Sequence, residues 1–301
     1  MNSKINLKNT EMKTPKETKK IQKQKPEKAN VSDKNLQSNI DATMQKDFAV
    51  EQTEDVRKAI EILNETGKVI DLIKNNKVEE AKQELAKIIG SLEILITKNP
   101  KIAVIPVDIR SQIVDAVVDI PTAEAIIKEV EEAVAEGYYQ TAKDLLEGLT
   151  SAYIIYVYML PLATYPDAMK VAAALLDQGK NEEAISTLIT ALNTLAIDKI
   201  EIPLPVLRAE EFIKLAAEVM KEDKENKKEE AKLFLENAEY QLELAEIMGY
   251  GKKDKEYKEI YEAIKALKKA IGEDHETEGL FGELSEKMKN FKERLFFKKN
   301  K

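Results

Sequence analysis

The feature that most constrains this sequence is one apolar run near its midpoint, residues 151–166, which read SAYIIYVYMLPLATYP. The run shows no alternation that would leave one side in water, and a helix that is apolar all round must be covered on every side. Pro161 can end a helix, because proline has no amide hydrogen to donate. We therefore expect residues 151–166 to form the central, buried helix of an α-helical domain.

Four of the ten tyrosines in the chain belong to this run, namely Tyr153, Tyr156, Tyr158 and Tyr165. At helical spacing the first three cannot all face one way, so at least one of them meets another surface. The run is also shorter than the roughly 20 residues that a membrane helix needs. Besides an internal helix, two alternatives stay open: an aromatic groove for a small molecule or peptide, and a contact between subunits, where a tyrosine keeps its hydroxyl paired.

Helical hairpins surround the run, because one short pattern occurs four times. A turn residue is followed by acidic or polar residues, then an alanine, then a leucine four residues later. The turn residues are Asn76, Gly137, Gly179 and Asn226, and the alanine–leucine pairs are Ala81 and Leu85, Ala142 and Leu146, Ala184 and Leu188, and Ala231 and Leu235. Acidic residues favour a helix N-terminus through the helix dipole. The small alanine lets two helices approach, and the leucine fills the seam between them.

This pattern predicts antiparallel helical hairpins that arose by internal duplication. It is similar to the tetratricopeptide repeat, but that repeat has a period of about 34 residues. The four alanines are separated by 61, 42 and 47 residues. The array is therefore irregular.

Two proline-punctuated segments interrupt the helical pattern, residues 101–108 (KIAVIPVD) and residues 198–207 (DKIEIPLPVL). Proline is tolerated in an edge strand but not in a central one. We expect two short extended segments, either paired as a two-stranded β-ribbon or serving as linkers. Residues 109–119 are expected to form a short helix or turn. The predicted fold is thus all-α, with at most one short β-ribbon.

The N-terminal 50 residues have a different composition, with 11 lysines against 6 acidic residues. They contain few apolar residues and no period, so we expect a disordered Lys-rich tail over residues 1–50. They also lack the apolar stretch of a signal peptide, which favours a cytoplasmic protein. The rest of the chain carries a net charge of −13, because the whole carries −8 and the tail +5. Such an acidic body is not expected to bind nucleic acid.

The C-terminal segment, residues 273–301, is expected to form an amphipathic helix after a helical domain that spans residues 51–272. Its apolar stripe consists of Leu284, Met288, Phe291 and Leu295. This stripe can dock on its own domain, on a second subunit or on an anionic membrane surface. Acidic residues beside the stripe disfavour the membrane.

No constellation for catalysis or metal binding is visible in the sequence. Cysteine is absent, and the single histidine, His275, lies among acidic residues in an expected loop. The acidic pair Glu182 and Glu183 lies at an expected helix start, where the helix dipole explains it. We therefore expect a protein that is not an enzyme and uses no cofactor or metal. The richness in lysine and glutamate is typical of thermophiles, although low genomic G+C content gives a similar bias.

The order of these features resembles the YfdX family of bacterial proteins, over roughly residues 52–250. The resemblance is carried by residues 59–92, by Ile105-Pro106-Val107-Asp108, by Tyr158-Met159-Leu160-Pro161-Leu162, by residues 168–195 with the Gly179-Lys180 turn, and by Ile202-Pro203-Leu204-Pro205. It implies a helical, self-associating protein linked to acid and other stress, with no established catalytic activity. Many family members carry an export signal, which makes the periplasm the alternative location. The extension from residue 252 falls outside the resemblance.

Taken with the resemblance, the sequence predicts a non-enzymatic stress-response protein that forms a dimer or tetramer. Chaperone-like shielding of client proteins is part of this hypothesis. The alternative is a protein that binds a small molecule or peptide through an aromatic groove near residues 153–165.

Overall fold

The computed structural model describes residues 26–27, 29, 31–49, 51, 53–117, 119–223, 225–251 and 255–294. This part of the chain is mostly helical, with eleven helices and a single small sheet of three strands. The helices are α1 (Asp33–Asp47), α2 (Glu54–Lys74), α3 (Val78–Lys98), α4 (Ile120–Ala135), α5 (Tyr139–Glu147), α6 (Tyr165–Asp177), α7 (Asn181–Asn193), α8 (Leu204–Glu222), α9 (Lys228–Ile247), α10 (Lys255–Gly272) and α11 (Glu278–Lys292). The strands are β1 (Val104–Asp115), β2 (Ser151–Pro161) and β3 (Ala196–Pro203).

The four predicted hairpins are present as α2–α3, α4–α5, α6–α7 and α8–α9. Three of their turn residues adopt the left-handed conformation that closes a helix, Asn76 with φ of 59°, Gly137 with 83° and Gly179 with 75°. The four marker alanines, Ala81, Ala142, Ala184 and Ala231, are all buried. The pattern therefore identified the helical hairpins of this fold correctly.

The central apolar run is a strand rather than a helix, which corrects the expectation for residues 151–166. Residues 151–161 form β2, and only from Tyr165 does the chain become helical, as α6. The segment Tyr153–Tyr158 consists of aromatic and β-branched residues, which fit a pleated sheet better than a helix. The residues from Ser151 to Ile155 are buried without interruption, as in a strand that is covered on both faces.

The sheet also corrects the expected two-stranded ribbon. The two proline-punctuated segments lie in β1 and β3, but each pairs with β2 and not with the other, in the antiparallel order β1–β2–β3. Residues 109–115, expected to form a short helix or turn, instead continue β1 along β2. Both proline-containing strands are thus edge strands, where proline is tolerated.

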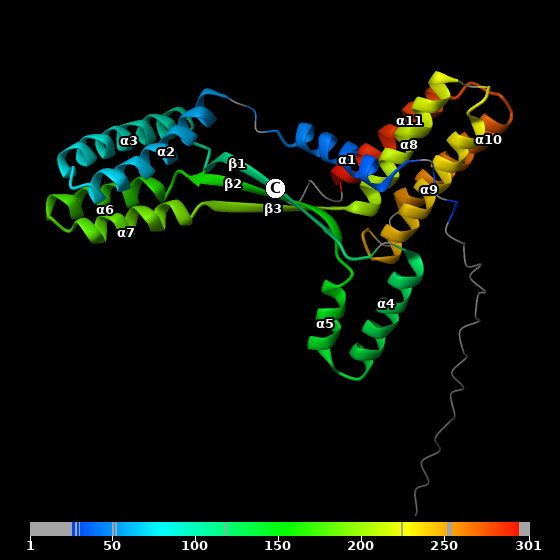
Figure 1. The fold of residues 1–301 in the computed structure, drawn as a ribbon, viewed down its shortest axis with the longest axis horizontal. Helices are drawn as coiled ribbons and strands as arrows, with labels where there is room; N and C mark the ends of the chain where they lie inside the picture. Colours follow the sequence, from blue (N-terminus) through cyan, green and yellow to red (C-terminus); the bar gives the residue numbers. More distant parts are fainter. Residues whose placement is uncertain are drawn as a thin grey trace, which may run out of the picture.

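Two helical bundles lie at opposite ends of this sheet (Figure 1). The first bundle consists of α2, α3, α6 and α7, and its core also includes Leu160 at the end of β2 and Leu162 just after it. The second bundle consists of α1 and α8–α11, and its core takes up Tyr153 and Ile155 from the other end. The central strand therefore connects two separate cores.

The hairpin α4–α5 belongs to neither bundle and projects from the molecule as an arm (Figure 1). It is inserted between β1 and β2, and its base packs on α9 through a small cluster that includes Ile120, Leu149, Tyr240 and Leu244. Further out, its buried residues are Val130, Ala133 and Ala142. We call residues 120–147 the arm.

The N-terminal segment is not uniformly without structure, which corrects part of the expectation for residues 1–50. Residues 33–47 form α1, whose N-cap Ser32 accepts a hydrogen bond from the amide of Asn35. Leu36, Ile40 and Met44 lie four residues apart and pack into the second bundle. Although the segment contains few apolar residues, this single apolar stripe is enough to hold α1 on the second bundle. Residues 1–25 lie outside the described part of the chain.

Candidate functional site

One face of the sheet carries two of the singled-out tyrosines side by side. Tyr156 and Tyr158 are two residues apart on β2, so their side chains lie on the same face of the sheet, and both are half-buried. Their cross-strand neighbours share that face: Arg110 and Lys199 opposite Tyr156, and Asp108 and Ile197 opposite Tyr158. We call this surface, completed by Glu201, the tyrosine face.

Ion pairs hold the charged residues of the tyrosine face in place. The guanidinium of Arg110 lies 4.9 Å from the centre of the Tyr158 ring, and its Nε donates to Asp108 Oδ2 at 2.9 Å. This hydrogen bond raises the pKa of Arg110. On the other side, Lys199 pairs with Glu201, and that contact raises the pKa of Lys199. The face therefore presents aromatic rings between two pairs of opposite charges.

The other two tyrosines lie elsewhere, so the four do not form one aromatic groove. Tyr153 points to the opposite face of the sheet and is buried in the core of the second bundle. Tyr165 begins α6 and is buried in the core of the first bundle. Side chains alternate between the two faces of a strand, so Tyr153 lies on the face opposite to Tyr156 and Tyr158. The helical interpretation of the run could not show this.

A groove of about 340 Å³ does lie beside Tyr165, between α6 and α7. Its lining includes Pro161 and a series of hydroxyl groups from Thr164, Ser186, Thr187, Thr190 and Thr194. The hydroxyls of Thr187, Thr190 and Thr194 already donate to carbonyl groups one turn earlier in α7. Each of them can still accept a hydrogen bond from a ligand.

Tyr165 lines this groove, and its hydroxyl belongs to a buried chain of hydrogen bonds. Its hydroxyl donates to Thr66 Oγ1 at 3.0 Å, and Thr66 donates to the carbonyl oxygen of Ile62 at 2.8 Å. Burial raises the pKa of Tyr165 to about 12. This tyrosine therefore stays protonated in the physiological range and acts as a fixed hydrogen-bond donor within the protein.

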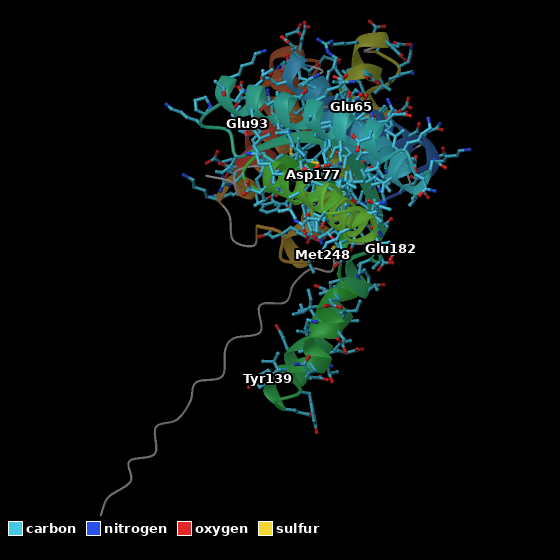
Figure 2. All side chains as sticks on the ribbon, turned by 90° about the vertical axis from the view of Figure 1, so that its left-hand side faces the viewer. Glu65, Glu93, Tyr139, Asp177, Glu182 and Met248 are labelled. Carbon is cyan, nitrogen blue, oxygen red and sulfur yellow. The ribbon has the colours of Figure 1, made fainter. Side chains whose placement is uncertain are left out.

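The arm carries the largest group of exposed apolar side chains among the described residues. They are Val134, Tyr138, Tyr139 and Leu146. Tyr139 lies at the far end of the arm, away from both bundles (Figure 2). The exposure of Leu146, at 53%, is notable because the equivalent leucines of the other three hairpins are fully buried. Within the described residues, the side of the arm that carries Leu146 is therefore not packed against another hairpin, unlike the same side of the other three hairpins.

The C-terminal stripe packs on its own chain. Leu284, Met288 and Phe291 of α11 are fully buried in the second bundle, where the ring of Phe291 meets that of Tyr257 edge-on at 4.8 Å. Of the three surfaces on which this stripe could dock, the structure places it on its own domain. Leu295 lies outside the described residues.

One polar cluster joins residues that sequence reasoning did not bring together. Asp115, at the end of β1, accepts hydrogen bonds from Ser151 of β2 and from Arg208 of α8. Burial opposes ionisation of Asp115, but the hydrogen bonds from Arg208 and Ser151 outweigh it and lower the pKa of this carboxyl. The three residues are separated by 36 and 57 positions in the chain, so no local spacing could have predicted the cluster.

No metal-binding arrangement is seen within the described ranges. They contain no group of three or more His, Cys, Asp or Glu side chains placed to hold a metal ion. His275 is an exposed residue whose imidazole lies 3.6 Å from a carboxylate oxygen of Glu273. Nor is any helix within these ranges long and apolar enough to span a membrane.

Comparisons with solved structures and with protein families find matches, whereas a comparison with curated proteins finds none. Among solved structures, the chain is similar to YfdX from Salmonella Typhi, with 18% sequence identity over 49% of this chain and 91% of the other, and a TM-score of 0.31. Among protein families, the model that matches is described as YfdX protein, and the match covers residues 62–200, from within α2 to within β3. The resemblance drawn from the sequence is thus confirmed by the YfdX family model, which matches residues 62–200 of this chain.

Proposed function

We propose that this protein is not an enzyme and acts by associating with itself and with other proteins under stress. The self-association is supported chiefly by the tyrosine face. The stress response follows from the YfdX resemblance, and the contact with client proteins is supported by the exposed apolar groups of the arm. The self-association and the contact with client proteins each have their own test.

The tyrosine face has the properties of a contact between two identical subunits. Ile197 is 56% exposed, and Tyr156 is packed into neither bundle core. Aromatic residues and arginine are enriched in protein interfaces. A two-fold contact pairs one surface with itself, so it requires a self-complementary surface. Two cations and two anions placed around the rings of Tyr156 and Tyr158 satisfy that requirement, because a rotated copy can bring each cation to an anion.

Sedimentation of the full chain at micromolar concentration tests this contact. We expect the wild type to sediment as a dimer or tetramer and Tyr156→Glu to sediment as a folded monomer, with an unchanged circular dichroism spectrum. Tyr138→Glu is the matched control, since it places the same charge on an exposed tyrosine of the arm, and it should leave the assembly intact. A monomeric wild type, or a Tyr156→Glu protein that still assembles, would rule out the tyrosine face as the interface.

The contact with client proteins is assigned to the arm. A group of exposed apolar side chains on one element is typical of a site of protein interaction. Here they lie on a projection that both bundles leave free (Figure 2). An unfolding client exposes apolar side chains, which such a surface can cover.

Light scattering of an aggregating model client tests this assignment. We expect the wild type to delay aggregation and Leu146→Ser to delay it less. The control is Ile94→Ser, which changes an apolar residue of similar exposure on α3, at 58%, and should protect as well as the wild type. Equal protection by the two variants, or none by the wild type, would contradict the role of the arm.

A second candidate function is ligand binding in the groove between α6 and α7. The specific observation in its favour is the line of hydroxyl groups beside the aromatic ring of Tyr165, which suits a small polar ligand. A ligand that binds only the native state must raise the melting temperature. A thermal-shift screen should therefore find one compound class that stabilises the wild type but not Ser186→Trp, which fills the groove. Glu182→Trp, one turn away on α7 and outside the lining, should keep the shift.

A further inference from the structure

The arm has a high density of negative charge. Residues 120–147 contain seven carboxylates and two lysines, a net charge of −5. Both lysines are already paired within the arm, Lys128 with Glu132 at 3.5 Å and Lys143 with Glu147 at 3.1 Å. The remaining five carboxylates have no ion-pair partner among the described residues: Glu124, Glu129, Glu131, Glu136 and Asp144. All five are exposed, next to the apolar residues of the arm.

The most basic segment of the chain is its first 25 residues. Residues 1–25 contain eight lysines and two glutamates, a net charge of +6. Their charge is therefore opposite to that of the arm and of nearly the same size. Opposite charges of this density attract one another over about 10 Å at an ionic strength of about 0.1 M.

The point at which this segment joins the described chain lies next to the base of the arm. Just after the segment, the carbonyl oxygen of Glu27 accepts a hydrogen bond from Asn237 of α9 at 3.1 Å. The hydroxyl of Tyr240, three residues further along α9, accepts a hydrogen bond from the amide of Ile120, the first residue of the arm, at 3.0 Å. Residues three apart in a helix are neighbours on its surface. The end of the basic segment and the base of the arm are thus attached to α9 at positions less than one turn apart.

The length of the segment is more than sufficient to follow the arm to its end. Twenty-five residues span at most about 90 Å when extended. The 16 residues of α4 measure about 24 Å along the helix axis. A tethered segment this close to its target binds at a high effective concentration, without loss of a second molecule's translational freedom.

We propose that residues 1–25 dock on the arm of the same molecule, with their lysines on the unpaired carboxylates and over the rings of Tyr138 and Tyr139. A lysine above a tyrosine ring gains a cation–π contact in addition to its ion pairs. The docked segment covers the apolar groups Val134 and Leu146 in the same step. Salt weakens the contact, because it screens the opposite charges. This inference goes beyond the proposed function and stands whether or not the protein assembles or protects clients.

Energy transfer between two dyes on the full chain tests the contact. The protein has no natural cysteine, so the dyes attach only where one is introduced. Asn9→Cys places one dye in the basic segment, and Gln140→Cys places the other near the tip of the arm. The control pair combines Asn9→Cys with Gln178→Cys, which lies at the tip of the α6–α7 hairpin. We expect the transfer efficiency of the arm pair to fall at least about twofold between roughly 20 mM and 500 mM salt, and that of the control pair to stay low.

Two triple variants then assign the contact to the carboxylates of the arm. The first is Glu129→Gln, Glu131→Gln and Glu136→Gln. The second, a control with the same change in charge, is Glu65→Gln, Glu93→Gln and Glu182→Gln, on the first bundle (Figure 2). At low salt, only the first variant should reduce transfer to its high-salt value.

Three results would overturn the proposal. The first is transfer that does not depend on salt. The second is an equal response of the control pair or of the control variant, which would mean that the segment collects on the acidic body at large. The third is transfer that appears only when donor-labelled and acceptor-labelled molecules are mixed, which would mean that the segment reaches another copy.

Discussion

The carboxylate of Asp115 accepts one hydrogen bond from each terminal nitrogen of Arg208, at 2.5 and 3.3 Å. Ser151 donates a third to the same carboxylate, at 2.7 Å. These contacts fasten the end of β1 to β2 and to α8. They lie where the chain leaves the sheet for the arm and later returns, so they fix the position at which the arm leaves the body.

Removing Arg208 should therefore destabilise the protein. In Arg208→Ala the partly buried carboxylate of Asp115 loses its cation, and we expect a loss of about 1–3 kcal/mol in the free energy of unfolding. Chemical denaturation measures this loss. Arg110→Ala is the control, because Arg110 forms its pair with Asp108 at the exposed surface of the same strand, and it should leave the denaturation midpoint unchanged. Equal midpoints for the two variants would contradict a structural role for the pair of Arg208 and Asp115.

The same cluster predicts a dependence on pH. A carboxyl whose pKa is lower in the folded than in the unfolded protein binds fewer protons when folded. The stability that Asp115 contributes is thus fully present above its unfolded pKa of about 3.9, and it is lost as the pH falls through the lower folded pKa. The difference in unfolding free energy between wild type and Asp115→Asn should shrink as the pH is lowered below about 4. A difference that stays constant from neutral to strongly acid pH would show that the charge of Asp115 does not stabilise the fold.

The helical hairpins were predictable because their signals are local. A turn residue such as Gly179, an alanine at Ala184 and a leucine at Leu188 lie within one or two helical turns of each other. The residues that end the first helix also fix where the second begins. The relation between these hairpins is not local, and neither their grouping into two bundles nor the projection of the arm follows from the pattern.

The sheet could not be predicted from period alone. A continuous apolar run fits a buried helix and a buried strand equally well. Residues 109–117 show the same ambiguity, since Ile109 and Ile113 share a side at helical spacing and also at strand spacing. In both segments the chain is a strand because neighbouring strands are available to pair with it. The available signal was the dense sequence of aromatic and β-branched residues in β2, which favours a strand.

The candidate site was predictable only in part. Tyr156 and Tyr158 were singled out by their place in the apolar run, and they share one half-buried face of the sheet. Tyr153 and Tyr165 were singled out for the same reason and lie in two different cores. Their separation depends on β2 passing between two bundles, which is a property of the whole fold and not of the run.

The buried hydroxyl chain below the groove gives a third prediction. In Thr66→Val the hydroxyl of Tyr165 loses its acceptor in a buried position, which costs about 1–3 kcal/mol. Tyr165→Phe removes that hydroxyl and leaves Thr66 its bond to Ile62, so it should cost less. Thermal unfolding of both variants and of the double variant gives the coupling between them. The double variant should be closer to Tyr165→Phe than to the sum of the two single changes. A simple sum would mean that the two hydroxyls do not interact.

The last prediction compares two leucines that occupy the same place in the repeated hairpin pattern. Leu188 lies one turn after Ala184 and is fully buried between the hairpins of the first bundle, whereas Leu146 lies one turn after Ala142 and is exposed on the arm. Truncation of a buried leucine loses its transfer free energy and leaves a cavity, so Leu188→Ala should cost about 2–5 kcal/mol. At high salt, where residues 1–25 are released from the arm, Leu146→Ala removes no surface that the described residues bury, and we expect a change below about 0.5 kcal/mol. Denaturation of the two variants measures both values. A cost at Leu146 that appears only at low salt would show that residues 1–25 cover its side chain. A large cost that persists at high salt would show that a second copy covers it.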